Sequence, residues 1–225
     1  MRAIAFRVCA GADSPRPTYD LSSLVNFRIG HDVHNMVQQA LLDIDPRWVI
    51  EADVKFPAPY SAMISGHADA WHPDEKIVLE LKTVGAYAYD RATGIQRSKR
   101  FKASTPEGPK FEHILQCALN GYGLGAEWLV IGYVAKEAVS IKMAESNDLD
   151  EIKRIYTDWW FPMADVKHLA EAELERIAQL YNVLGNDLDP NSVPTEIMGS
   201  DLVPRPITPH TVWNCDYCSY EGECI

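Results

Sequence analysis

The chain has 225 residues, of which 47% are hydrophobic and 24% charged, a composition typical of one soluble globular domain with a substantial core. The formal net charge of -11 argues against a protein that coats nucleic acid nonspecifically, although one local basic patch could still grip a strand. The apolar run at 128–134 is far too short to span a membrane. Because Arg7 interrupts the short apolar stretch at the start, we expect no secretory signal and a cytoplasmic location.

The first half of the chain predicts one helix and three strands. Residues 24–42 carry apolar residues at helical spacing and should form an amphipathic helix that ends before Asp45 and Pro46. Strand-like stretches follow at 48–56, 62–71 and 76–83. The last two are separated by a plausible tight turn at 72–75 and should form a hairpin.

The second half is less regular. Residues 85–110 are polar and basic without a clear period, whereas 111–124 predict a helix. Two further strands are expected at 127–135 and 138–143, joined by a short turn near Lys136. Asp148 and Glu151 resemble a capping box, so we expect a helix from there to about residue 184, broken or restarted at Pro162.

This order of elements implies an α/β fold with a mixed central β-sheet flanked by helices, over residues 1–186. Residues 187–225 form a separate part. Five prolines between 187 and 210 indicate an extended arm that carries a cysteine-rich tail across the domain surface.

Two neighbouring predicted strands carry a set of acidic and basic side chains. Gly66 and Asp69 lie in one strand, and Glu80 and Lys82 lie in the next. Because side chains alternate along a strand, Glu80 and Lys82 point to the same face, and hairpin pairing would place Asp69 beside Glu80. Two carboxylates could hold Mg²⁺ or Mn²⁺, with a lysine nearby to act on an attacking water, which is the set that phosphodiester hydrolysis needs.

A Glu-x-Lys pair alone is weak evidence. Glu151 and Lys153 have the same spacing, but they lie in a predicted helix, where residues two apart diverge, and no Gly-x-x-Asp strand precedes them. Without that strand, Glu80 and Lys82 would more simply be a salt bridge of the sheet.

The combination Gly-x-x-Asp and Glu-x-Lys between apolar strands resembles the RecB-like branch of the PD-(D/E)XK nucleases, which implies a restriction-endonuclease-like fold. The branch also has Gly-x-x-x-His on its first helix, matched by Gly30 and His34. The resemblance implies that His34 is a metal ligand with Asp69 and Glu80, whereas His31 has no such support.

A further motif of this branch, Gln-x-x-x-Tyr on the helix after the hairpin, is matched by Gln116 but has Asn120 in place of the tyrosine. Gln116 is therefore a candidate for active-site or DNA contacts. Tyr122 lies on another face of the helix and is a poor substitute for the missing tyrosine.

Three cysteines crowd into the tail with the spacing C-x2-C-x5-C, at Cys215, Cys218 and Cys224. From spacing alone, a zinc site and an iron-sulfur cluster are equally open. The tail resembles that of the CRISPR-associated RecB-like exonucleases and the AddB nuclease domain, which implies a 4Fe-4S cluster completed by one distant N-terminal cysteine. Cys9 is the available candidate, and Cys117, within a helix, is expected to be a buried thiol.

Two alternatives concern the fourth ligand. If Cys9 serves, the tail packs near the N-terminus. In the family, however, the cysteine precedes an Arg and a short apolar stretch, and residues 2–6 (R-A-I-A-F) resemble that stretch, which would place the ligand upstream of Met1.

A basic segment directly follows Lys82. It is either a solvated loop or a loop that binds DNA phosphates beside the active site, with Tyr89 and Phe101 as weak candidates for base stacking. Its cations are Arg91, Arg97, Lys99, Arg100, Lys102 and Lys110.

The first hypothesis is therefore a Mg²⁺- or Mn²⁺-dependent DNA exonuclease acting at DNA ends or on single strands, with Asp69, Glu80, Lys82 and Gln116 at its active site. The alternatives are a catalytically silent DNA-end-binding module with a structural iron-sulfur cluster, and a zinc-binding interaction protein. Intact Asp69, Glu80 and Lys82 count against the silent module.

Overall fold

The structure is a computed structural model that describes residues 20–95, 105–146 and 149–186. The chain divides into two compact units. Residues 25–57 and 64–170 form the unit that holds the sheet, and the other unit includes the described residues 20–24, 58–63 and 171–186. The proline-rich arm and the cysteine tail lie outside the described residues.

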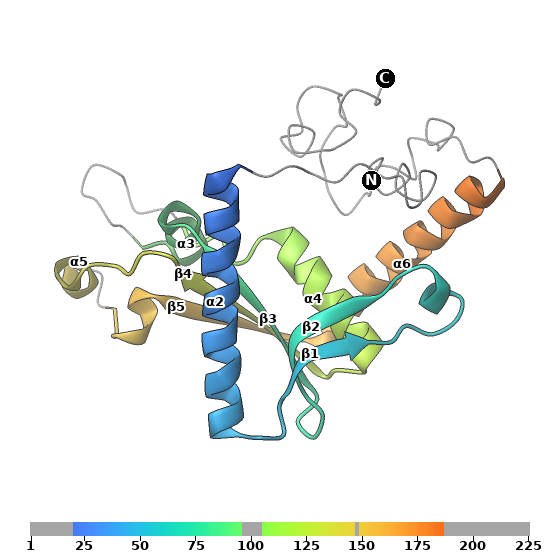
Figure 1. Ribbon diagram of the computed structural model, residues 1–225, viewed down its shortest axis with the longest axis horizontal. Coiled ribbons are helices and arrows are strands. Elements are labelled where there is room, and N and C mark those ends of the chain that lie inside the picture. The colour runs from blue at the N-terminus through green and yellow to red at the C-terminus, as the bar shows by residue number, and fades with distance from the viewer. Residues whose placement is uncertain (1–19, 96–104, 147–148, 187–225) are drawn as a thin grey trace. The chain divides into compact units, whose positions relative to one another are not determined.

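A five-stranded mixed sheet forms the centre of the first unit, as the sequence predicts (Figure 1). The strands lie in the order β1-β2-β3-β4-β5, and only the β3–β4 pair is parallel. The predicted hairpin is the antiparallel pair of β2 and β3. Strand bounds are β1 Val49–Val54, β2 Gly66–His72, β3 Ile77–Val84, β4 Trp128–Ala135 and β5 Tyr156–Pro162.

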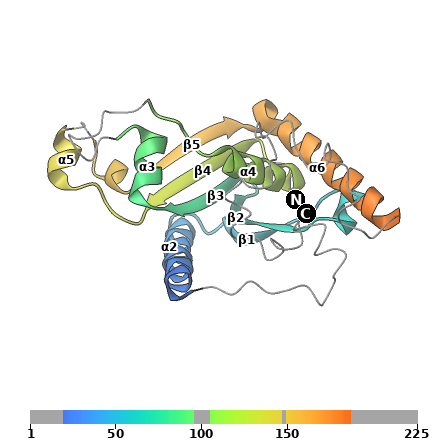
Figure 2. The same cartoon turned by 90° about the horizontal axis from the view of Figure 1, so that it is seen from above.

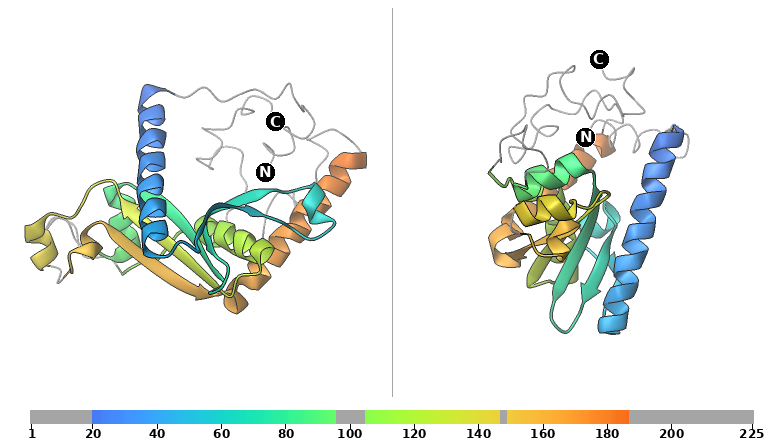
Figure 3. Two further views of the ribbon diagram at one scale, coloured as in Figure 1. Left: turned by 60° about the horizontal axis from the view of Figure 1, so that its bottom comes forward. Right: turned by 90° about the vertical axis from the view of Figure 1, so that its left-hand side faces the viewer.

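Helices lie against both faces of this sheet. Figures 2 and 3 show α2 on one side of the strands and α3 and α4 on the other. The bounds are α2 Leu21–Ile44, α3 Ala86–Thr93, α4 Phe111–Leu124, α5 Ile141–Ser146 and α6 Met163–Asn186, with single 3-10 turns η2 at Tyr60–Ala62 and η3 at Ile152–Arg154. No helix of the described residues has the length and apolar character that a bilayer crossing requires.

Apolar stripes explain how the helices pack. Val37 and Leu41, one turn apart on α2, contact the buried cluster of Leu79, Leu81 and Val130 together with Ala70. On the other face, Gly121 lets α4 approach the sheet closely, because a Cβ at this position would lie 2.3 Å from the Cδ2 of buried Leu129. The contact with α4 holds the central strands in place for the site described below.

Two predicted elements are wrong, and a region for which no element was predicted contains a helix. Residues 85–110 contain the short helix α3, which ends at Gly94 with a φ of 75°, a left-handed conformation that glycine adopts without strain. The strand predicted at 138–143 is replaced in part by α5. The part of the predicted helix between residue 148 and Pro162 contains strand β5 instead, because its aromatic and β-branched residues complete the sheet beside β4. The predicted restart at Pro162, with an end near residue 184, is confirmed by α6. Pro162 ends that strand, where no ladder hydrogen bond is lost, and α6 begins directly after it.

Candidate active site

Asp69 lies where strands β2 and β3 separate. The two strands pair only from Ala70 with Leu79 to His72 with Ile77. Beyond that point the Asp69 carboxylate takes the place of a backbone partner, since its Oδ2 accepts a hydrogen bond from the Leu81 amide at 2.6 Å. The carboxylate is therefore fixed to the middle of β3.

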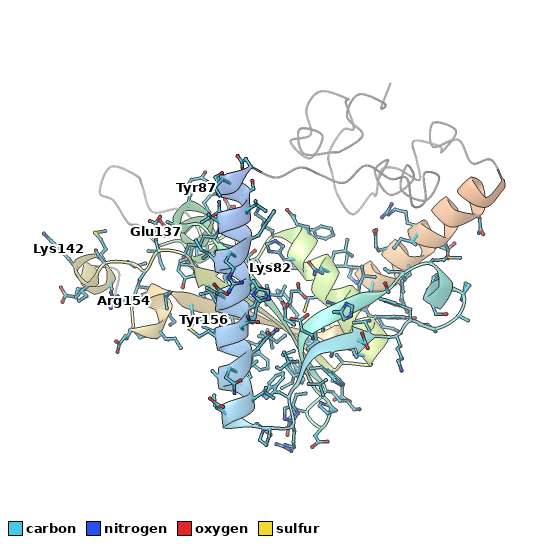
Figure 4. The ribbon with its side chains drawn as sticks, in the orientation of Figure 1. Lys82, Tyr87, Glu137, Lys142, Arg154 and Tyr156 are labelled. Carbon is cyan, nitrogen blue, oxygen red and sulfur yellow. The ribbon has the colours of Figure 1, made fainter. Side chains whose placement is uncertain are left out.

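Glu80 and Lys82 share one face of β3, as the alternation of side chains along a strand predicts. Lys82 is labelled in Figure 4. The Glu80 side chain is only 2% exposed, and its Oε1 accepts a hydrogen bond from the Lys82 ammonium at 2.5 Å. Lys82 also donates to Gln116 Oε1 at 3.0 Å. The structure thus brings Gln116 of α4 to the Glu-x-Lys pair of β3.

Asn120 is a site residue that the sequence reasoning missed. This residue stands where the nuclease motif has tyrosine, and its Nδ2 donates to Glu80 Oε2 at 3.2 Å and to the His67 carbonyl at 3.1 Å. Asn120 lies one helical turn after Gln116, so both side chains reach the same strand. The i, i+4 spacing of two amides was the available signal. The asparagine holds the second oxygen of Glu80 in place.

His34 reaches the site from α2. Its Nδ1 lies 3.3 Å from Asp69 Oδ1, and this hydrogen bond raises the pKa of His34 above its ordinary value, although burial opposes the shift. One turn later, buried Gln38 donates to the Asp69 carbonyl at 2.9 Å and to Glu51 Oε1 at 2.7 Å. Gln38 therefore fixes α2 against β2 and sets the approach of His34. His31 is exposed on another face of the helix and contacts Asn35.

Burial dominates the electrostatics of Glu80. The pKa of Glu80 is raised to about 7, mainly by loss of hydration; the Lys82 ammonium opposes this shift and the nearby Asp69 carboxylate adds to it. Two carboxylates therefore share a poorly hydrated site with Lys82 in contact with one of them. Such a site gains stability from any additional positive charge that binds between the carboxylates.

The chemical types of the ligands at this site suit a hard divalent cation. Asp69 and Glu80 offer carboxylate oxygens and His34 offers an imidazole, and these groups are ordinary ligands of Mg²⁺ or Mn²⁺. As they stand, no three acidic, histidine or cysteine side chains among the described residues converge closely enough to hold a metal. At this site the partner of Glu80 Oε1 is the Lys82 ammonium. A cation would replace the lysine as the partner of Glu80.

A second polar pair lies beside Lys82. Tyr133, the β4 partner of Lys82 in the parallel ladder, accepts a hydrogen bond from the Lys110 amide at 2.9 Å, and its hydroxyl is hydrogen-bonded to His113 Nδ1 at 2.6 Å. Burial, aided by the Lys82 charge, lowers the pKa of His113 to about 4. The imidazole is therefore neutral at neutral pH.

The basic segment is described only at its two ends. Arg91 forms an ion pair with Glu107, and Lys110 precedes α4. The four cations between residues 97 and 102, and Phe101, lie outside the described residues. The suggestion that Tyr89 stacks on bases is wrong, because this side chain is fully buried and its hydroxyl donates to the Lys153 carbonyl at 3.0 Å.

Among the cysteines, only Cys117 falls in the described part of the chain. It is a buried free thiol, as expected, and burial raises its pKa well above the ordinary value. A thiol so placed is a poor metal ligand, because ligation needs the thiolate. Cys9, Cys215, Cys218 and Cys224 lie outside the described residues.

No family model and no curated protein matches this chain. Among solved structures, the chain resembles a phage-related exonuclease from Haemophilus somnus 129PT, with a TM-score of 0.49 and 10% identity over 84% of this chain and 83% of that one. It also resembles the crystal structure of SSO0001, with a TM-score of 0.47 and 19% identity over 91% of this chain and 70% of that one. Both likenesses are distant, so the function has to be inferred from the site itself.

Proposed function

We propose that this protein is a Mg²⁺- or Mn²⁺-dependent deoxyribonuclease that hydrolyses phosphodiester bonds at DNA ends or in single strands. The observation that supports it is the meeting of Asp69, Glu80 and Lys82 at the point where β2 and β3 separate, with Glu80 almost fully buried. A buried salt bridge alone would not need a second carboxylate beside it, since that carboxylate raises the cost of keeping Glu80 charged.

Each side chain has a part in this reaction. Asp69, Glu80 and His34 would hold the cation, which supplies positive charge to the scissile phosphate when bound. Asn120 and the Leu81 amide keep the two carboxylates oriented. Lys82, released from Glu80, would orient the attacking water, and Gln116 would keep the ammonium within reach of it. The oxygen of water would bond to phosphorus as the bond to the leaving sugar oxygen breaks, and one proton of the water would end on that leaving oxygen.

End-labelled single- and double-stranded DNA, incubated with and without Mn²⁺, tests this proposal. We expect Glu80→Ala and Lys82→Ala to lower the cleavage rate by on the order of a thousandfold, which corresponds to several kcal/mol in the barrier. Both variants should still bind DNA and remain folded.

The chain offers a matched control for this experiment. Glu151 and Lys153 repeat the Glu-x-Lys spacing but are exposed at η3, so Glu151→Ala and Lys153→Ala should cleave like the parent. Parental cleavage by Glu80→Ala and Lys82→Ala would refute the assignment. DNA binding without cleavage by the parent in Mn²⁺ would instead favour a silent DNA-end-binding module.

We further propose a 4Fe-4S cluster held by Cys215, Cys218, Cys224 and Cys9. The support is the C-x2-C-x5-C spacing of the tail together with the burial of Cys117, which removes that thiol as a competing fourth ligand. The cluster would fasten a proline-rich arm that has little apolar surface of its own to bury.

A further inference from the structure

Two tryptophans are exposed on the face of the sheet opposite Glu80. Trp128 begins β4 and is 42% exposed, and Trp160 on β5 is 53% exposed. Their rings lie 6.5 Å apart in an edge-to-face arrangement. In the ladder Trp160 pairs with Val130, and Val130 pairs with Leu79, so these three side chains lie on one face of the sheet. Trp128, which pairs with Pro162, lies two residues before Val130 and therefore on the same face, opposite Glu80.

The tryptophans line a hollow of about 610 Å³ at the end of the sheet where β3 and β4 begin. Ile77 contributes to its floor, and the turn between β2 and β3 contributes Asp74, Glu75 and Lys76 to its rim. Glu127 lines it next to Trp128. The hollow therefore combines exposed aromatic surface with an acidic rim.

Most of the rim charges already have partners. Lys76 forms an ion pair with Glu127 at 2.5 Å, and Asp74 forms one with Arg47 at 3.0 Å. The exposed Glu75 carboxylate forms no ion pair with any described residue. One negative charge beside two open indole rings is thus left without a counter-charge.

We propose that this hollow binds an arginine side chain of a partner polypeptide. A guanidinium stacks on an indole face through cation–π attraction and pairs with a carboxylate through two parallel hydrogen bonds, so one side chain satisfies both features of the hollow. DNA does not fit, because its phosphates would meet Asp74, Glu75 and Glu127.

A polypeptide suits the hollow better than a small cation does. The volume exceeds what one side chain fills, and Trp160 belongs to β5, the last strand of the described sheet. The free edge of β5 offers backbone hydrogen bonds to an extended segment lying beside the tryptophans. The partner is therefore an extended peptide segment that presents arginine.

A peptide titration tests this proposal. The protein is titrated with a short acetylated peptide of two arginines separated by glycine, and binding is followed by calorimetry and by tryptophan fluorescence. We expect saturable binding that Glu75→Gln and Trp160→Ala each weaken by about tenfold, the step that about 1.4 kcal/mol produces. The lysine version of the peptide should bind more weakly, and a glutamate version should not bind.

Glu137→Gln is the matched control, since Glu137 is exposed just beyond the opposite end of β4 and lies outside the hollow. It should bind the peptide like the parent. Glu75 is an exposed turn residue, so its variant keeps the test valid if Trp160→Ala does not fold. Unchanged binding by Glu75→Gln, absence of saturation at about 10 mM peptide, or displacement of the peptide by an oligonucleotide would overturn the proposal. None of these readouts depends on DNA cleavage.

Discussion

Replacing Glu80 with glutamine should stabilise the metal-free protein at alkaline pH. Burial raises the pKa of Glu80 from 4.5 to about 7, so the folded state binds more protons than the unfolded state between these values. Stability is therefore lost as the pH rises through this window. The shift of about 2.5 pH units corresponds to about 3 kcal/mol above pH 7, at about 1.4 kcal/mol per unit. Glutamine has the shape of the protonated acid and avoids this cost.

Thermal unfolding followed by circular dichroism in EDTA measures the difference. For a chain of this size, about 3 kcal/mol corresponds to an increase in Tm of roughly 6–12 °C for Glu80→Gln at about pH 8, whereas the difference at about pH 5 should be below about 1 kcal/mol. The exposed control Glu151→Gln should show no such pH dependence. An equal difference at both pH values, or a less stable Glu80→Gln protein at pH 8, would refute the reasoning.

Other outcomes follow from the same site. Mn²⁺ should raise the Tm of the parent more at pH 8 than at pH 5.5, because protons compete for the ligands, and Glu80→Gln should lose most of this gain. His34→Ala should weaken Mn²⁺-supported cleavage while His31→Ala does little, and the reverse ranking would mean that the ligand face of α2 is misassigned. Asn120→Leu leaves Glu80 Oε2 without its donor and should lower the cleavage rate by about ten- to a hundredfold with DNA binding retained, as a filter-binding assay can check. Anaerobic purification should give brown protein with about four irons per chain. Colourless protein that contains zinc would refute the cluster, and a cluster that survives Cys9→Ser would refute only the assignment of Cys9 as its fourth ligand.

The sequence predicts the strands that carry the candidate site well because their signal is local. The predicted ranges 48–56 and 127–135 contain strands β1 and β4, and the ranges 62–71 and 76–83 fall one residue short of the ends of β2 and β3. The helix expected at 111–124 has the observed bounds of α4. The position of Asp69 beside β3 follows from a hairpin whose turn residues are visible in the sequence. That the side chains of Glu80 and Lys82 lie on the same face follows only from the alternation of side chains along one strand.

What the sequence did not reveal depends on tertiary contacts. Strand β5 was taken for a helix, because its aromatic residues have no alternation of their own and acquire their conformation by pairing with β4. Asn120 and Gln38 act on Glu80 and on the Asp69 backbone from two helices on opposite faces of the sheet. The spacing of Gln116 and Asn120 places both amides on one face of α4, but only the packing of that helix on the sheet shows that Glu80 is the partner of Asn120. The same holds for the link from Tyr133 to His113.

The parallel pairing of β3 with β4 also determines when the site can assemble during protein synthesis. His34, Asp69, Glu80, Lys82 and Asn120 have all left the ribosome once residue 120 has emerged, yet β3 then has a neighbour on one side only. Its other neighbour begins at Trp128, and both its ladder and the packing of α4 on Leu129 have to wait for that segment. An unfinished chain therefore carries these side chains before the framework that aligns them has formed, so the proposed activity would have to wait until β4 is in place.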